Sequence, residues 1–367
     1  MRKSKRAFLL GLILIGLVAS FGSAPRTAAK PVAATGPVIL KRTIYVYNYR
    51  FLRYWPNPKA AEPQYNTWSW VPRIEFELIG PVPGGSQWVV DFQKPDGSPW
   101  ISYKCKTDEL GDDELGKVES PFSTDEDEKK AITQTGLFPF KIRLKNALAG
   151  TDTVMFEGKA KVGTYAPDQT IPEYKGKREF FVDQDWRLPM AVVWLNPTFD
   201  ENVPPLSVTM WFRGASGGAK LDAFLVRNGQ PIATVESTGN NLEGELKTGV
   251  GDPMGSWGRF TWTFVKVRGF NKDTSASRYP DVFYLDKNPG DYELRVLRNG
   301  KLARVAKFSV GADGWPNDNG VAANNKMGGI RRIIPVQIVG DQDIGYNPLA
   351  WKTEILYGNP LAGFTAP

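Results

Sequence analysis

Histidine is absent from the 367-residue sequence, and cysteine occurs once, as Cys105. Without imidazole the chain cannot form a Ser-His-Asp triad, a Cys-His dyad or a His-ligated zinc or copper site. A single cysteine excludes an intramolecular disulfide, so the folded state must be stabilised by burial of a core. Catalysis would have to depend on carboxylates, a Ser-Lys pair, tyrosine or a metal held by oxygen atoms.

The sequence also lacks a stripe of Lys and Arg with interleaved aromatic residues, and it lacks long amphipathic helical patterns. The formal net charge is +7, and four of the basic residues precede residue 20, so cleavage there lowers the charge to +3. This weak positive balance argues against a nucleic-acid partner, whose phosphates need a concentrated basic surface.

The first 20 residues have the order of an export signal. A basic start, Arg2 to Arg6, precedes the apolar run AFLLGLILIGLVAS, which is shorter than the roughly 20 residues of a comfortable membrane span. Small residues allow cleavage after Ser20 or as late as residue 34, and an uncleaved anchor is the alternative. We therefore expect a secreted or periplasmic protein with no transmembrane span after cleavage, in which residues 21–36 form a flexible spacer.

From residue 37 onward the pattern is that of β-structure. In RIEFELIG (73–80) apolar and charged residues alternate, which places Glu75 and Glu77 on one face and apolar residues on the other. Asn299-Gly300 supplies the positive φ angles of a tight hairpin turn. Strands every ten or so residues, punctuated by 37 glycines and 28 prolines, predict β-sandwiches.

Two segments resemble each other at the interval of one domain. KREFFVDQDW (177–186) and VAKFSVGADGW (305–315) both contain Phe-x-Val, an acidic turn and a Trp, and similar hairpin patterns precede both in the same order. Likeness of composition among β-rich sequences is the alternative, but composition does not fix order. The sequence thus predicts two tandem immunoglobulin-like β-sandwiches related by internal duplication, 37–186 and 187–315, with Trp186 and Trp315 at equivalent core positions.

Residues 316–367 form a C-terminal arm that is too short for a third sandwich. Its apolar, strand-like run 330–340 must pair with a sheet. We expect it to dock on its own chain near the junction of the two domains, because a tethered strand has a high effective concentration. Strand addition to another molecule, with self-assembly through the arm, is the alternative. The candidate residues of such a partner strand are Ile333, Ile334, Val336 and Ile338.

Acidic residues gather in the segment 107–130, where ten of them accompany three lysines. Their spacing matches no calcium loop, and the composition predicts a long solvated loop that is dispensable for folding. Calcium or a basic partner is the alternative ligand. The repeated tripeptide Asp-Gln-Asp, at 183–185 and 341–343, is interpreted as a strand terminator rather than a metal site.

Twelve tryptophans provide candidates for a glycan platform, since sugar rings stack on exposed aromatic faces. Core packing is the alternative use of the same residues. A glycosidase would need two opposed carboxylates, and nothing in the sequence selects a pair from the candidates. The platform candidates are Tyr65, Trp68 and Trp70, and the carboxylate candidates are Glu75, Glu77, Asp91 and Asp222. Cys105 alternates with apolar residues, which predicts burial.

Together these patterns predict an exported, non-enzymatic binding or structural protein of the cell envelope or extracellular space. Its partner would be a protein or a glycan, and no catalytic residue, cofactor site or metal site is predicted. The alternative is a glycan-binding or carboxylate-based glycan-processing protein. No motif assigns the chain to a family.

Overall fold

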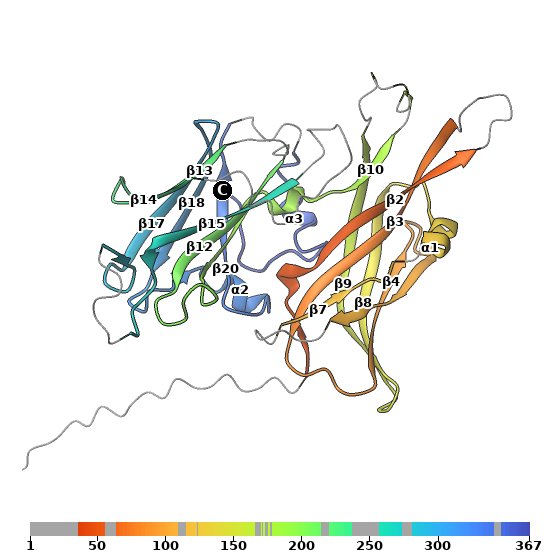
Figure 1. Ribbon diagram of the computed structural model, residues 1–367, viewed down its shortest axis with the longest axis horizontal. Coiled ribbons are helices and arrows are strands. Elements are labelled where there is room, and N and C mark those ends of the chain that lie inside the picture. Colours follow the sequence, from red (N-terminus) through yellow and green to blue (C-terminus); the bar gives the residue numbers. More distant parts are fainter. Residues whose placement is uncertain are drawn as a thin grey trace, which may run out of the picture. The chain divides into compact units, whose positions relative to one another are not determined.

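The computed structural model describes residues 36–55, 64–108, 115–122, 124–165, 178–213, 220–236, 257–273, 281–340 and 346–367, with residues 170, 172, 175 and 176. The predicted export signal and most of the spacer lie outside these residues. The described chain is all-β, with three short α-helices (Figure 1). None of the described helices is long and apolar enough to cross a membrane.

The first half of the chain forms two antiparallel sheets. Sheet A has the order β2-β3-β7-β6, and the short β1 pairs with the end of β3 on the same side as β2. Sheet B has the order β5-β4-β8-β9-β10. The strands of sheet A are β1 (Val38–Ile39), β2 (Tyr45–Trp55), β3 (Gln64–Ile79), β6 (Lys106–Asp108) and β7 (Leu115–Glu119). Those of sheet B are β4 (Ser86–Gln93), β5 (Pro99–Lys104), β8 (Gly136–Asn146), β9 (Thr151–Tyr165) and β10 (Glu179–Val182).

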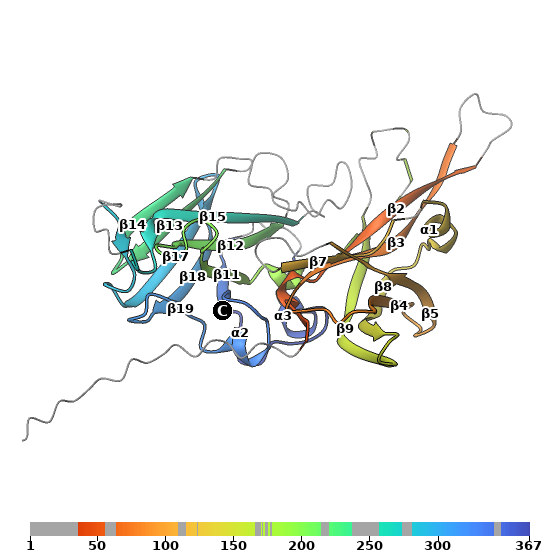
Figure 2. The same cartoon turned by 60° about the horizontal axis from the view of Figure 1, so that its bottom comes forward.

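The second half forms one ten-stranded sheet in two parts joined by β20. Sheet C has the order β11-β12-β15-β16, and sheet D has the order β14-β13-β17-β18. β19 lies beside β18 (Figure 2). Sheet C consists of β11 (Met190–Leu195), β12 (Pro205–Arg213), β15 (Trp257–Arg268) and β16 (Phe283–Tyr284). Sheet D consists of β13 (Leu221–Arg227), β14 (Gln230–Glu236), β17 (Gly290–Arg298), β18 (Lys301–Val310) and β19 (Pro316–Asn317).

Alternation of apolar and polar residues builds both cores, as the sequence predicts. In β3 the side chains of Ile74, Phe76 and Leu78 are buried between sheets A and B, while Glu75 and Glu77 point away. The hairpin of β17 and β18 turns at Asn299-Gly300, whose φ angles of 51° and 78° are those of a type I′ turn. Cys105 is buried, as predicted, and burial raises the pKa of its thiol to about 12.

The predicted C-terminal strand docks within its own chain. β20 (Arg332–Ile338) pairs with β11 through residues 332–335 and with β18 through residues 336–338, so it crosses from sheet C to sheet D. The amide of Val336 donates to Pro189 O (2.8 Å) and that of Val339 to Ala303 O (3.0 Å). The candidates for a partner strand are therefore packing residues: Ile333, Ile334 and Val336 are buried in the chain's own cores, and Ile338 is half-buried.

The rest of the arm packs on the first half. It includes α2 (Val321–Asn324) and α3 (Ala350–Thr353), and its apolar side chains belong to the core between sheets A and B. The backbone carbonyl of Tyr357 accepts a hydrogen bond from the amide of Lys159 in β9 (2.5 Å). Its hydroxyl accepts from the amide of Val46 in β2 (3.1 Å) and donates to Ile44 O (2.8 Å). Tyr357 thus connects sheet A with sheet B.

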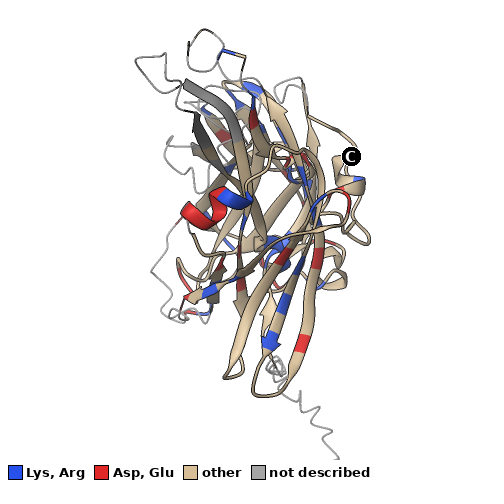
Figure 3. Ribbon diagram, turned by 90° about the vertical axis from the view of Figure 1, so that its right-hand side faces the viewer, with Lys and Arg blue, Asp and Glu red and all other residues tan. Residues whose placement is uncertain are grey.

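The acidic segment is not the solvated loop that its composition predicts. Its described residues form β6, β7 and α1 (Thr124–Lys130), and Figure 3 shows the acidic first turn and basic end of this helix. β7 pairs with β3 and buries Val118 in the first core. Asp127 is 3% exposed and forms an ion pair with the buried Arg73 (2.7 Å). The segment is therefore part of the fold rather than a solvated loop, and on this basis we expect its deletion to lower the stability of the chain.

The two Phe-x-Val segments both lie in strands, but at different places in the sheet order. Phe180–Val182 lies in β10, the last strand of sheet B, whereas Phe308–Val310 lies in β18, which is followed by β20. By sheet order, β18 corresponds to β9 and β20 to β10. Trp186 is buried in a 3₁₀ turn (Asp185–Arg187), while Trp315 is half-buried after β18. The two Phe-x-Val segments, which match in sequence, therefore lie one strand apart when the two halves are compared by sheet order.

Candidate functional site: a cationic pocket

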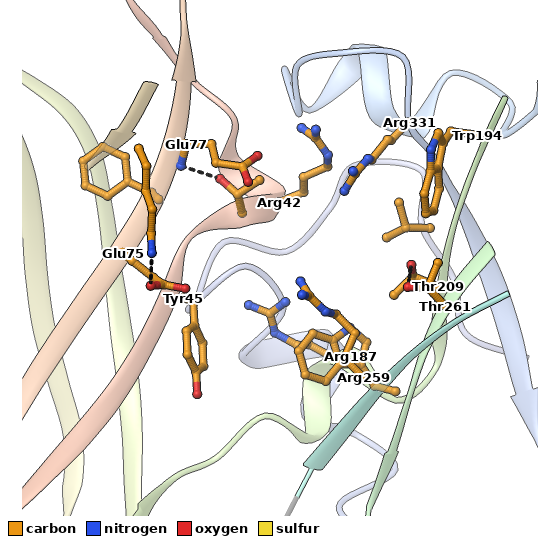
Figure 4. A pocket seen from close by; sticks show the side chains of 15 residues that line it. Arg42, Tyr45, Glu75, Glu77, Arg187, Trp194, Thr209, Arg259, Thr261 and Arg331 are labelled. Atoms are coloured by element: carbon orange, nitrogen blue, oxygen red, sulfur yellow. Dashed lines mark hydrogen bonds and ion pairs between the residues drawn. The ribbon is translucent and has the colours of Figure 1, made fainter. Parts of the chain in front are cut away.

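A pocket of about 390 Å³ lies where the outer face of sheet A meets the outer face of sheet C (Figure 4). Its side chains come from β2, β3, β7, β11, β12 and β15 and from the segments beside them. The residues that line it are Arg42, Thr43, Tyr45, Glu75, Phe76, Glu77, Lys117, Arg187, Val192, Trp194, Thr209, Trp211, Arg259, Thr261 and Arg331.

The wall from sheet C follows from strand alternation. Inward residues of β11, β12 and β15 fill the second core, so the alternate residues Trp194, Trp211 and Arg259 face the pocket. Trp211 pairs with Arg259 across the strands, and Thr209 pairs with Thr261, with their hydroxyls 2.7 Å apart. This wall presents two indoles, two hydroxyls and a guanidinium on one sheet face.

The wall from sheet A carries the carboxylates. Glu75 and Glu77 stand on the outer face of β3, opposite the inward residues of the same strand. Lys117 on β7 binds Glu75 (3.0 Å) and lies 3.6 Å from Glu119. Burial raises the pKa of Tyr45, which is therefore a neutral phenol that can donate a hydrogen bond. Five cationic side chains thus share the pocket with two carboxylates.

Arg42 is a half-buried cation without a matching carboxylate contact. Its NH1 group donates to Gly328 O at 3.4 Å, and its buried Nε has no hydrogen-bond partner among the described residues. Burial and, next, the charge of Arg331 lower the pKa of Arg42 to about 10, while Glu77 acts in the opposite direction. The charged form of Arg42 is thus disfavoured by its surroundings, and a bound anion would stabilise it.

Arg187 is buried, and its hydrogen bonds within the described chain go to neutral oxygen atoms. Nε donates to Gln184 Oε1 (2.9 Å), and NH2 donates to Ile44 O (2.8 Å) and to the hydroxyl of Tyr357 (3.0 Å). The guanidinium also lies 4.7 Å from the ring centroid of Trp211. These contacts fix the group in place, and none of the hydrogen bonds of Arg187 within the described residues goes to a carboxylate.

The platform candidates from the sequence are not assembled as a platform. Trp70 is 1% exposed, donates its indole N–H to Gln134 O (3.0 Å) and packs edge-on against Trp100 and Phe138. It is therefore a core residue, since β3 turns this side chain toward sheet B. Tyr65 and Trp68 lie outside the residues whose side chains the structure describes.

The carboxylate candidates are separated. Glu75 and Glu77 line the pocket, whereas Asp91 on β4 forms an ion pair with Arg143 (2.6 Å) and Asp222 on β13 lies 3.4 Å from Lys220. No group of three or more metal-ligating side chains occurs within the described residues. The second Asp-Gln-Asp, 341–343, lies outside them.

The first Asp-Gln-Asp is a structural junction. Asp185 is buried and accepts hydrogen bonds from Arg213 (3.0 Å), the indole of Trp257 (2.8 Å) and the amide of Asn347 (2.7 Å). Burial and the neighbouring Asp183 raise the pKa of Asp185 to about 6, against the effects of Arg213, Asn347 and Trp257. Asp185 therefore connects the turn before β11 with sheet C and the C-terminal arm.

Sequence reasoning missed the cations of the pocket because they come from distant segments. The available signal was the position of Trp194 and Trp211, which alternate with residues of the second core and so lie on the other face of their sheet, where each is 7% exposed. Large aromatic residues on the face of a sheet that points away from its core indicate that other parts of the chain cover that face. The chain matches no protein-family model and no curated protein.

Proposed function

We propose that this chain is an exported, non-enzymatic binding protein of the cell envelope or extracellular space, and that it binds an anionic ligand in the cationic pocket. The observation that carries the proposal is the pair Arg42 and Arg187, a half-buried and a buried guanidinium group whose described hydrogen bonds go to neutral oxygen atoms. Burying a charge without a counter-charge is costly. A ligand oxyanion would remove that cost.

The proposal includes the fold family and its origin. We infer that the two halves are immunoglobulin-like sandwiches derived by duplication. Their support is the shared strand order: β2-β3-β7 with β5-β4-β8-β9-β10 in the first half, and β11-β12-β15 with β14-β13-β17-β18-β20 in the second. Export is supported by the basic and apolar order of residues 1–20. N-terminal sequencing of secreted protein should give a start between residues 21 and 35.

A carboxylate-based glycosidase is the weaker candidate. Glu75 and Glu77 are the carboxylates of the pocket, but both stand on the same face of one strand. Two carboxylates on one wall cannot approach a glycosidic bond from opposite sides, as acid and base or nucleophile must. Glu75 is in addition held in an ion pair with Lys117 (3.0 Å).

Binding and release assays on the same polysaccharides separate the two functions. Tryptophan fluorescence should change when anionic polysaccharides are added and not when neutral ones are added, because Trp194 and Trp211 line the pocket. Binding should weaken as salt rises, since salt screens the attraction. Binding without release of oligosaccharides supports the proposal. Product formation that is lost in Glu75→Gln or Glu77→Gln would instead establish the enzyme.

A further inference from the structure

We infer that the ligand of the cationic pocket is a uronate-type acidic sugar, with one carboxylate on a ring that otherwise carries hydroxyl groups. This inference rests on the proposed function, anion binding, and adds the chemical class of the anion. It combines three features of the pocket: an arginine pair for the carboxylate, indole-backed guanidinium groups, and acceptors for hydroxyl groups.

Arg42 and Arg331 form the carboxylate subsite. Both line the pocket, they lie close enough for the charge of Arg331 to disfavour that of Arg42, and the buried Nε of Arg42 lacks a partner among the described residues. Arginine binds carboxylates through two parallel N–H groups, and charge-assisted hydrogen bonds of this kind are the strong ones. A carboxylate bound between the two guanidinium groups would relieve the repulsion between these cations.

The indole rings hold guanidinium groups rather than a sugar. Arg331 lies 4.5 Å from the ring centroid of Trp194, and Arg187 lies 4.7 Å from that of Trp211. A guanidinium stacked on a ring keeps its N–H groups at its edge, where they can reach an oxyanion. The stacking also removes water from one face of the cation, which strengthens its attraction for an anion.

The carboxylates of β3 distinguish a sugar acid from a compact dianion. Glu75 and Glu77 would repel a phosphate or sulfate ester, whose charge is concentrated and whose oxygen atoms are mainly acceptors. A uronate carries hydroxyl groups that can donate to these carboxylates. The hydroxyls of Thr209 and Thr261, on the facing wall, can both donate and accept. The pocket volume of about 390 Å³ suits a small ligand or the end of a polymer chain.

The test uses trigalacturonate and its methyl ester, which has the same rings without the negative charges. Titration calorimetry on the full mature chain should detect binding of trigalacturonate, and conversion to the ester should weaken it by about tenfold or more. Arg42→Gln should weaken trigalacturonate binding to a similar degree. Arg332→Gln is the matched control, because Arg332 is a neighbouring half-buried arginine that does not line the pocket. Should Arg42→Gln fail to fold, Arg331→Gln replaces it.

Glu77→Gln separates the ligand classes. If sugar hydroxyls donate to Glu77, this variant binds trigalacturonate more weakly than the wild type does. If the pocket takes a dense oxyanion instead, the variant binds inorganic phosphate or a sulfated trisaccharide more tightly, because a repulsive charge is gone. Equal loss of affinity in Arg42→Gln and Arg332→Gln would overturn the assignment of the subsite.

The two proposals fail in different ways. Binding of sulfated or phosphorylated ligands that depends on Arg42, with no binding of trigalacturonate, would overturn the uronate class and leave anion binding standing. Absence of binding for all of these anions, in protein whose thermal unfolding is normal, would overturn the proposed function itself.

Discussion

The two halves of this protein arrange their strands in the same order but join their sheets by different means. In the second half β20 pairs with β11 and with β18, so backbone hydrogen bonds connect sheet C with sheet D. Among the described residues of the first half, β10 pairs with β9 alone, and side chains connect sheet A with sheet B. Asn48 donates to Phe180 O (2.6 Å), Tyr103 donates to Pro72 O (2.9 Å), and Tyr357 of the arm bonds to both sheets through its carbonyl and hydroxyl. β20 and Tyr357 both come from residues after 315. The arm therefore contributes to the connection between sheets in both halves.

Removal of the whole arm has the largest expected effect. Truncation after Gly314 deletes β20 and Tyr357, and with them buried side chains of both cores. We expect no cooperative thermal unfolding transition by circular dichroism, because both cores would be opened to water. A soluble monomer with the Tm of the full chain would contradict the account.

Truncation after Gly340 sharpens the comparison by keeping β20. It removes the arm after β20, including α3 and Tyr357, most of whose buried side chains belong to the first core, although Tyr346 packs with Trp211 and Trp257 of sheet C. We expect the second half to retain protection from limited proteolysis while the first half is cleaved, since its core loses Ile355, Leu356 and Tyr357. Equal cleavage of both halves would show that they do not respond separately.

The two junction tryptophans should differ in their contributions. Trp186 is 2% exposed and packs against Tyr357, with ring centroids 5.2 Å apart, so Trp186→Ala should lower the free energy of unfolding by about 3–5 kcal/mol. Trp315 is half-buried and lies at the margin of the second core. For Trp315→Ala we expect a loss of about 1–2 kcal/mol. Urea unfolding measures both, and equal losses would show equivalent environments.

Loss of the Tyr357 hydroxyl tests the connection in the first half alone. Tyr357→Phe leaves the ring in place but deprives the amide of Val46 and the guanidinium of Arg187 of a buried acceptor. We expect a loss of about 1–3 kcal/mol in the free energy of unfolding. Tyr47→Phe is the control, because Tyr47 is half-buried and lies next to Val46 in β2. A loss no larger than that of the control would mean that the hydroxyl does not stabilise the fold.

The smallest expected effect is a pH dependence from Asp185. Its pKa in the folded state, about 6, exceeds its ordinary value of 3.8, so the folded chain holds the proton more tightly. The Asp185 contribution to stability is therefore fully present below about pH 4 and falls as the pH rises toward 6.

Asp185→Asn should remove that slope. The difference in unfolding free energy between wild type and variant should decrease from pH 4 to pH 6, as measured by urea unfolding at each pH. Asp91→Asn removes an ion-paired carboxylate at a more exposed position and is the control. A difference that stays constant, or that rises with pH, would contradict the raised pKa.

Local pattern predicted the strands well, because alternation and turn residues act over a few positions. The inward face of β3, the Asn299-Gly300 turn and the burial of Cys105 are examples. The position of β20 between β11 and β18 could not be predicted, since that pairing joins residues far apart in the sequence. Proline is disfavoured inside a sheet because it has no amide hydrogen to donate, yet Pro335 lies within β20. It is tolerated because it lies where pairing changes from β11 to β18.

Composition was misleading where single contacts decide the structure. The acidic segment folds because Val118 reaches the first core and Asp127 meets the buried Arg73. Trp70 resembled a platform residue, yet strand alternation places it in the core. The pocket depends on Arg42, Arg187 and Arg331, which no local pattern connects. Only the outward tryptophans of β11 and β12 gave a readable signal.

Amide hydrogen exchange tests the central claim, that the arm joins the sheets of both halves, most directly. Four amides report on it: Val336 and Val339 bind Pro189 O and Ala303 O, while Lys159 and Val46 bind the carbonyl and hydroxyl of Tyr357. We expect all four to exchange as slowly as the interior amides of β12, because each opens only when the sheets of its half come apart. Exchange of all four as fast as the amides of the edge strand β14, with β12 still protected, would contradict the claim.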